Sequence, residues 1–217
     1  MYKWITQHHD LRLADLKVSL EDNNFEVFIA ENKEDAKKIV LEELLPKIAP
    51  QSISWGGSMT FVASGLYDEI KDNSDFEVID TYDHTLPVEE SMDRRRRALL
   101  VDLFFTGTNA ITEDGMLVNL DMLGNRIGGL TFGPKNVIVL AGQNKIVGDL
   151  EDAMNRIKNY VAPVNVARLK KKTPCAKTSY CDDCKSPDRI CNTWTITEKS
   201  FPKGRVRIVL IKESLGF

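Results

Sequence analysis

Two spacings of hydrophobic positions alternate along the chain. Apolar residues recur at every third or fourth position, as on one face of a helix, in residues 2–22, 33–45, 88–104 and 149–161. Between these segments lie short apolar runs that are typical of strands, in residues 25–30, 52–55, 76–80, 136–141 and 205–211. Helices and strands that alternate in this way predict βαβ units, and hence an α/β fold with a central, mainly parallel sheet.

Length and composition predict a single domain over residues 1–217. With 42% hydrophobic and 28% charged residues, the chain can bury one substantial core. Residues 170–197 differ from the rest, because they are polar, rich in lysine and poor in periodic apolar positions. We expect this segment to leave the core as a cysteine-rich excursion near the C-terminus, since it can bury little surface.

Charge and hydropathy indicate which binding partners and which cell compartment to expect. The formal net charge of -3 gives no general attraction to nucleic acid. No apolar run approaches the ~20 residues of a membrane helix, and the first residues are too polar for a signal peptide. We expect a cytoplasmic protein that binds neither nucleic acid nor a membrane.

A glycine pair and hydroxyl residues follow the strand-like run 52–55. Glycines let the backbone approach a ligand closely, and the free N–H groups at a helix start attract an anion. The motif is neither a Walker A loop nor a dinucleotide fingerprint. We predict that Gly56, Gly57, Ser58 and Thr60 bind a small anionic ligand. The alternative is a plain strand-to-helix turn with Ser58 as the N-cap.

Glu113 stands before an Asp-Gly turn between two short β-prone runs, which indicates a hairpin with a carboxylate at a strand end. Open α/β sheets bind ligands beyond the carboxyl ends of their strands. We therefore predict that Glu113 is catalytic and faces the same pocket, with Asn109 or Asn125 and one arginine of 94–97 nearby. The alternative is an ordinary solvated turn residue.

All four cysteines lie within the polar segment, at Cys175, Cys181, Cys184 and Cys191. Their spacing, with one Cys-x-x-Cys pair, suits thiolate ligation of zinc or of an iron–sulfur cluster. Free or redox-active thiols and disulfides are the alternatives, and a reducing cytosol disfavours the disulfides. We expect the four sulfurs to converge on one site, because a metal would order a segment that packing alone cannot.

Several motifs together match a known family. They are Trp55-Gly-Gly-Ser-Met-Thr60, Asp93-Arg-Arg-Arg96, Thr106-Gly-Thr-Asn-Ala-Ile-Thr-Glu-Asp-Gly115, Asn125-Arg-Ile127, Phe132-Gly-Pro-Lys135 and Val147-Gly148. From about residue 5 to its end, the chain resembles the LUD domain of the lactate utilization protein C family. The resemblance implies a fold of the CoA-transferase, ribose-phosphate isomerase and glucosamine-phosphate deaminase type. It also implies a role in oxidising lactate to pyruvate, alongside iron–sulfur partner proteins.

The resemblance also suggests roles for individual residues. Gly56, Gly57, Ser58 and Thr60 match the turn that binds phosphate or cofactor in the sugar-phosphate relatives. Glu113 is similar to the nucleophilic glutamate of CoA-transferases, although aspartate follows it here where those enzymes carry asparagine. The four-cysteine segment is an addition that the simplest members of the family lack.

Three functions are compatible with these observations. The first is a subunit of an iron–sulfur-dependent L-lactate oxidation system. The second is a stand-alone enzyme of the CoA-transferase or sugar-phosphate isomerase type, with Glu113 as nucleophile or general base. The third is a non-catalytic ligand-binding module that has kept the fold. The sequence leaves open whether the chain is itself an enzyme, which metal it binds and whether it forms a homo-oligomer.

Overall fold

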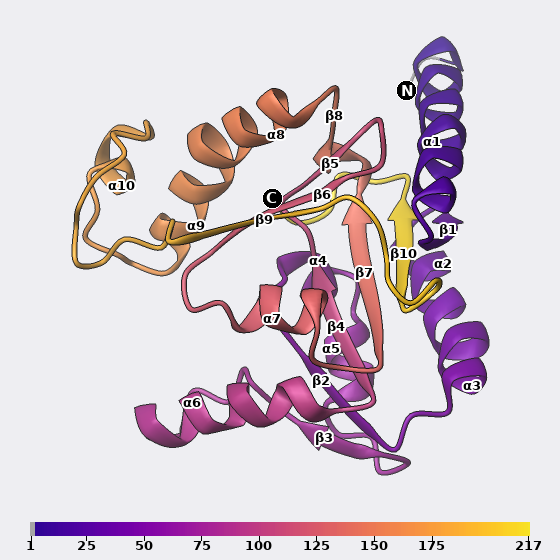
Figure 1. The fold of residues 1–217 in the computed structure, drawn as a ribbon, viewed down its shortest axis with the longest axis horizontal. Helices are drawn as coiled ribbons and strands as arrows, with labels where there is room; N and C mark the ends of the chain where they lie inside the picture. The colour runs from indigo at the N-terminus through magenta and orange to yellow at the C-terminus, as the bar shows by residue number, and fades with distance from the viewer. Residues whose placement is uncertain (1–2) are drawn as a thin grey trace.

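The computed structural model describes residues 3–217. Within these residues, six parallel strands form a central sheet in the order β1-β10-β7-β4-β2-β3 (Figure 1). Their bounds are β1 (Glu26–Ala30), β2 (Ser52–Trp55), β3 (Glu77–Ile79), β4 (Leu103–Gly107), β7 (Asn136–Gly142) and β10 (Val206–Ile211). The predicted fold class, an α/β fold with a central parallel sheet, is therefore confirmed.

A second sheet stands beside the carboxyl end of β4. Its order is β8-β5-β6-β9, and its strands are β5 (Ala110–Thr112), β6 (Leu117–Asp121), β8 (Ile146–Val147) and β9 (Thr193–Thr197). Strands β5 and β6 pair antiparallel and form the predicted hairpin. Because β5 begins three residues after β4 ends, the hairpin grows directly out of the central sheet.

Helices cover both faces of the central sheet (Figure 1). The longest stretch of regular helix is α1 (Lys3–Asp22). The others are α2 (Lys33–Lys38), η1 (Ile39–Leu44), α3 (Leu45–Ile48), α4 (Met59–Ala63), α5 (Leu66–Ile70), α6 (Val88–Arg97), η2 (Ala98–Leu100), α7 (Asn125–Thr131), η3 (Gln143–Lys145), α8 (Leu150–Arg156), η4 (Ile157–Val161), α9 (Ala162–Arg168) and α10 (Cys175–Thr178). None of the helices described is long and apolar enough to cross a bilayer.

Two helical segments continue through a proline, although proline normally interrupts a helix. The helix predicted to end at residue 45 runs on to Ile48, with Pro46 inside it. Pro163 lies in the same way inside α9. In both cases a wide π-type turn, η1 or η4, comes just before the proline-containing helix. A wide turn shifts the hydrogen-bond pattern by one residue, which accommodates a residue without an N–H group.

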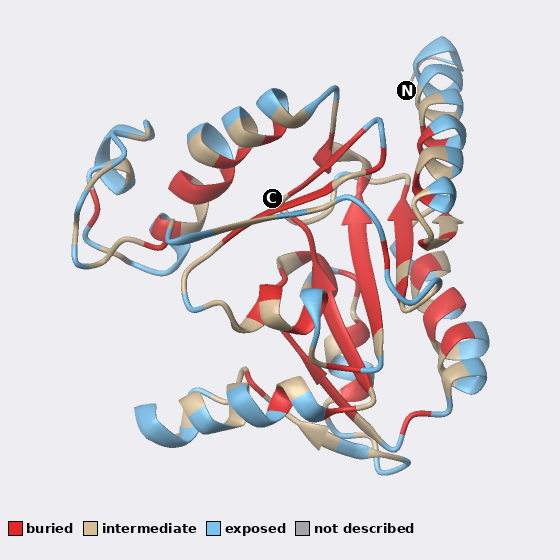
Figure 2. Ribbon diagram, in the orientation of Figure 1, coloured by how far each residue is buried: buried red, intermediate tan, exposed pale blue. Residues whose placement is uncertain are grey.

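Strand β7 separates two hydrophobic layers, because its successive side chains point to opposite faces. Ile138 and Leu140 pack in one layer with residues of η1, α4 and α5. Val137, Val139 and Ala141 pack in the other layer with residues of α1. Figure 2 shows the central strands buried along most of their length. Burial on both faces explains why residues 136–141 read as one continuous apolar run.

The cysteine-rich segment projects from the core beyond α9, as predicted, but it is shorter than expected (Figure 1). Thr193–Thr197 forms β9, which pairs antiparallel with β6. The alternating sequence Thr-Trp-Thr-Ile-Thr suits a half-buried strand. The excursion therefore ends at about residue 192, and β9 returns the chain to the second sheet.

Neighbouring glycines in α7 provide a test of the packing between α7 and β4. A Cβ at Gly129 would lie 2.5 Å from Phe104 Cε1, so Gly129→Ala should destabilise the protein by about 1–3 kcal/mol through overpacking. A Cβ at Gly128 meets Leu99 at an ordinary 3.6 Å, so Gly128→Ala should stabilise by about 0.5–1 kcal/mol through helix propensity. Urea unfolding of the two variants measures both changes. Equal effects from the two substitutions would contradict the packing.

Candidate functional site

A cavity of about 580 Å³ lies at the carboxyl ends of β2, β4 and β7. Gly57 and Ser58 line it just beyond β2, Gly107 and Thr108 line it at the end of β4, and Lys145 lines it shortly after β7. The second sheet, η4 and α9 supply further lining. Cavities of roughly 300–1,000 Å³ hold small molecules in many proteins. The position is the one predicted for a ligand site in an open α/β sheet.

The two glycines of the turn after β2 differ in the space around them. A Cβ at Gly56 would lie 2.9 Å from Arg126 Cγ, so this position has no room for a side chain. A Cβ at Gly57 would meet nothing within 4 Å, and Gly57 lines the cavity. Thr60 is buried behind the turn, where its hydroxyl donates to the Leu215 carbonyl at 3.2 Å. Of the four residues predicted here, Gly57 and Ser58 therefore line the cavity, and Gly56 and Thr60 lie behind it.

The N–H group of Ser58 is already paired, contrary to the expectation that it would be free for an anion. It donates to the Tyr82 hydroxyl at 2.8 Å, and that hydroxyl donates to the Gly56 carbonyl at 2.9 Å. Burial raises the pKa of Tyr82 to about 12, so the phenol stays neutral. Ser58 Oγ accepts from the Phe61 N–H at 3.2 Å and caps α4, which has only five residues. Ser58 is therefore an N-cap, the alternative reading of this motif, placed at the cavity wall.

Arg126 holds the start of the hairpin against the central sheet. It is 7% exposed, and its guanidinium donates to Asn119 Oδ1 at 2.6 Å and to Asn109 Oδ1 at 3.0 Å. It also donates to the Leu120 carbonyl at 3.2 Å, and its Nε lies 3.6 Å from Asp121 Oδ1. Asn109 lines the cavity, as does the predicted Asn125. Asn109 is therefore oriented by Arg126.

Lys145 is the most unusual charged group of the site. It is 4% exposed, and its Nζ donates to the Thr108 carbonyl at 3.0 Å. Among the described residues no carboxylate pairs with it. Burial, together with the nearby Arg156 and Arg126 guanidinium groups, lowers the pKa of Lys145 to about 7. A buried lysine without an acid is costly for the fold, and such groups occur often at functional sites.

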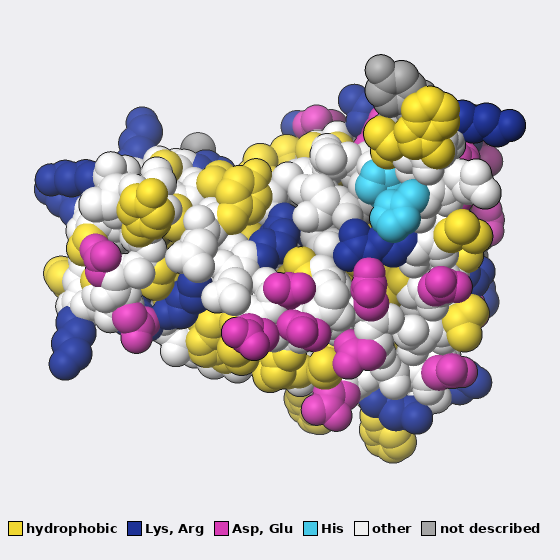
Figure 3. Space-filling view, turned by 90° about the horizontal axis from the view of Figure 1, so that it is seen from above, with side chains coloured by type: hydrophobic (Ala, Val, Ile, Leu, Met, Phe, Trp, Pro, Cys, Tyr) yellow, Lys and Arg dark blue, Asp and Glu magenta, His cyan; other side chains and the backbone are white. Residues whose placement is uncertain are grey.

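The cavity lining carries an excess of positive charge. Asp121 is the one acidic side chain among the described lining residues, and Arg126 pairs with it. The basic side chains of the lining are Arg95, Arg126, Lys145, Arg168 and Lys171. Of the arginines 94–97, Arg95 lines this cavity, whereas Glu113, beside which one of them was expected, does not. Figure 3 shows both basic and acidic side chains on the face seen there, so basic side chains do not dominate that face.

Glu113 lies outside this cavity, so the predicted neighbourhood of Glu113 and Gly57 is wrong. Its carboxylate is 50% exposed and pairs with Arg12, with 2.6 Å between Oε1 and Nε. Asn109 reaches the cavity at the start of the hairpin, and Glu113 is four residues further on, about 13 Å at ~3.3 Å per residue. The hairpin carries the carboxylate away from the ends of the parallel strands. A chemical role for Glu113 elsewhere stays a prediction.

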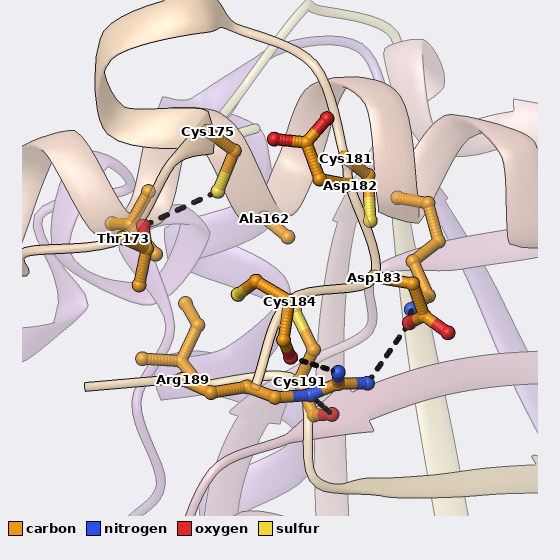
Figure 4. A pocket seen from close by; sticks show the side chains of 12 residues that line it. Ala162, Thr173, Cys175, Cys181, Asp182, Asp183, Cys184, Arg189 and Cys191 are labelled. Carbon is orange, nitrogen blue, oxygen red and sulfur yellow. Dashed lines mark hydrogen bonds and ion pairs between the residues drawn. The ribbon is translucent and has the colours of Figure 1, made fainter. Parts of the chain in front are cut away.

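The four cysteines line one small cavity, but they do not stand together as ligands of a single ion. Cys175, Cys181, Cys184 and Cys191 all line one small cavity of about 20 Å³, and none forms a disulfide (Figure 4). Within the part of the chain that the structure describes, no three His, Cys, Asp or Glu side chains already stand as ligands around a single ion. That all four cysteines line this cavity is observed, whereas a single metal site on them stays a prediction.

The sequence analysis missed Lys145, Arg126 and Tyr82. Lys145 could have been found, because it follows the central strand by three residues, at the same carboxyl edge that pointed to Gly57. Arg126 lies in the motif Asn125-Arg-Ile127 without an assigned role, and Tyr82 lies in no motif; both act through contacts with residues distant in the sequence.

Comparison with known proteins agrees with this architecture. The sequence pattern described as the LUD domain matches residues 13–211. The crystal structure of a DUF162 family protein from Deinococcus radiodurans aligns with a TM-score of 0.52 at 14% identity, over 94% of this chain and 98% of that chain. At this identity the likeness shows the fold. No curated protein matches the chain.

The unusual state of Lys145 predicts how stability depends on pH. Its pKa is about 7 in the folded protein and 10.5 in an unfolded chain, so between these values the unfolded state binds more protons and stability rises with pH. Lys145→Met should therefore raise the unfolding free energy below pH 7. It should also remove the increase in unfolding free energy that Lys145 causes between pH 7 and pH 10.5. Urea unfolding at pH 6, 8 and 10 measures it, with the exposed Lys203→Met as control. Parallel pH profiles for wild type and Lys145→Met would contradict the burial argument.

Proposed function

Because the chain belongs to the LUD domain family, which is associated with lactate utilization, we propose that it is the ligand-binding subunit of an L-lactate oxidation system. In this proposal the cavity at the ends of β2, β4 and β7 binds a small anionic ligand. Oxidation of lactate to pyruvate releases two electrons and two protons, and iron–sulfur partner proteins take up the electrons. The setting would be the cytoplasm.

The observation that carries this proposal is the buried Lys145 without a carboxylate partner. A buried charge without a counter-ion costs several kcal/mol, and an anion bound in the cavity would supply the missing partner. Binding of the anion favours the charged ammonium and therefore raises the pKa of Lys145. The cavity and its lysine thus form an incomplete ion pair that a ligand completes.

A second polar group indicates what else the ligand carries. Asp121 Oδ2 is buried and has no hydrogen-bond partner among the described residues, and Asp121 lines the cavity. An unpaired buried acceptor is costly, and a hydroxyl group of the ligand would satisfy it. Lysine for an anionic group and aspartate for a hydroxyl suit a hydroxy acid or a sugar or nucleoside phosphate.

The volume of the cavity distinguishes between these ligands. About 580 Å³ exceeds what a three-carbon acid fills, and it lies in the range of sites for larger molecules. Lactate or pyruvate would therefore leave room for a second molecule, whereas a nucleotide-like anion would use more of the space. Calorimetry with L-lactate, pyruvate, ribose 5-phosphate and a nucleoside monophosphate separates these cases. No heat with any of them, and none with sulfate, would contradict an anion site.

The other functions receive less support. A stand-alone transferase that uses Glu113 as its nucleophile requires this carboxylate at the substrate, and Glu113 instead pairs with Arg12 outside the cavity. A non-catalytic binding module shares the same cavity. It differs from the proposed subunit in one measurable way: lactate oxidation by the reconstituted system would not depend on the chain.

Gly57 provides a steric test of the cavity. Gly57→Val should abolish binding of pyruvate and of ribose 5-phosphate, because Gly57 lines the cavity and a Cβ at this position meets no protein atom within 4 Å. The backbone at Gly57 lies outside the left-handed region, so the fold should survive. Calorimetry measures the binding and circular dichroism the fold, with Gly57→Ala expected to be intermediate. Wild-type affinity in the valine variant would place the ligand elsewhere.

The pKa of Lys145 predicts a pH dependence of binding. Above about pH 7 the free lysine is neutral, so the affinity for pyruvate or sulfate should fall by up to about tenfold for each pH unit between 7 and 9. These probes keep their charge over that range. Lys145→Arg should bind with little change between pH 6 and 9, and Lys145→Met weakly throughout. A flat profile in the wild type would exclude Lys145 as the titrating contact.

A further inference from the structure

The four cysteine side chains surround one space, although they come from separate parts of the excursion (Figure 4). Cys175 begins α10, Cys181 and Cys184 lie in the irregular loop after it, and Cys191 lies just before β9. Each thiol is partly buried and free. Four free thiols on one cavity form the ligand set of a thiophilic metal, since thiolates bind zinc and iron–sulfur clusters.

Arg189 fixes the backbone around this space. Its Nε donates to the Cys191 carbonyl at 2.8 Å, and its Nη1 donates to the Cys184 carbonyl. Its Nη2 lies 3.1 Å from Asp183 Oδ1, which also accepts from Lys158 Nζ of η4 at 2.6 Å. One guanidinium thus holds two cysteine-bearing segments together and ties them to the core. These contacts use backbone and carboxylate groups and leave the four sulfurs available.

Apolar packing contributes little to the order of the loop that carries these cysteines. Between Cys181 and Cys191 only Ile190 is buried, and several of the intervening side chains are exposed. Segments that bury so little surface are seldom ordered by packing, because conformational entropy opposes it. Metal ligation in small sites contributes enough free energy to order such a segment.

The cysteine cavity shares a wall with the ligand cavity. Ala162, Ile190 and Cys191 line both. From this arrangement we propose that Cys175, Cys181, Cys184 and Cys191 bind one metal centre, and that this centre forms part of the boundary of the ligand cavity. Occupancy of the centre would fix Cys191 and Ile190, and thereby fix one side of the ligand site.

Two observations bear on the kind of centre. About 20 Å³ is room for one ion or one water molecule, which suits a single zinc ion. However, no three of the described side chains are already grouped around one ion. In a 4Fe–4S cluster each thiolate binds a different iron atom, so the four cysteine sulfurs lie further apart than they do around a single zinc ion. Both kinds of centre use the same four thiolates, and metal analysis distinguishes them.

The test uses the full chain purified without oxygen. We expect about one zinc ion or one iron–sulfur cluster per chain by elemental analysis, with absorbance near 400 nm in the cluster case. The metal should protect all four cysteines from alkylation, as seen by mass spectrometry. Cys184→Ser should lose most of the metal, whereas exposed Lys185→Ala, next to it in the same loop, should keep it. Hydrogen exchange should show a more open 170–192 segment in Cys184→Ser.

Failure of the metal proposal can be distinguished from failure of the proposed ligand site, because Gly57→Val should lose the ligand and retain the metal. In the wild type, metal loading should tighten the binding of pyruvate or ribose 5-phosphate, because Ala162, Ile190 and Cys191 line both cavities. Failure to bind metal after anaerobic purification and after reconstitution with zinc or with iron and sulfide would overturn the proposal. Equal alkylation of the cysteines with and without metal would do the same.

Discussion

The buried guanidinium of Arg126 is the contact on which the arrangement of the two sheets depends. It joins α7 to Asn109 at the start of the hairpin and to Asn119 and Leu120 in β6. A buried charge is tolerated only when its donors are satisfied, so these partners have little freedom to move. The glycine at position 56 follows from the same constraint, because a Cβ there would overlap the arginine stem. Arg126 thus accounts for the glycine at position 56 and fixes Asn109 at the cavity.

That cation also sets the electrostatics of the site. Arg126 and Arg156 lie near Lys145 and, after burial, are the groups that lower its pKa. Arg156 is itself occupied, since it donates to the carbonyls of Asn109 and Asn144. Two structural arginines therefore create a positive potential, and the lysine that experiences it has no structural partner but one carbonyl. Burial of Lys145 without a carboxylate partner therefore costs the folded protein free energy, and an anion bound in the cavity would reduce that cost.

The fold was largely predictable from sequence, because β7 and the hairpin carry strong local patterns. Strand β4 was missed, since Leu103-Phe-Phe105 continues the apolar pattern of the preceding helix without a break. Gly57 and Ser58 were predictable because they follow the end of a strand, whereas Asn109 and Asn125 were named only as neighbours of Glu113. Glu113 was misplaced because a hairpin signal gives no direction relative to the sheet. Tyr82 and Arg126 act through long-range contacts that no local pattern encodes.

The wide turn at Ile157–Val161 joins α8 and α9 into one helical rod and offsets their hydrogen-bond patterns by one residue. Ala153 of α8 packs against the second sheet, as do Ile157 and Val161 of the turn. Beyond the turn, Asn165 and Arg168 of α9 line the ligand cavity and take no part in that apolar cluster. One rod therefore supplies both the apolar support of the second sheet and part of the polar lining, and substitutions at Asn165 or Arg168 would change the lining while leaving the apolar contacts in place.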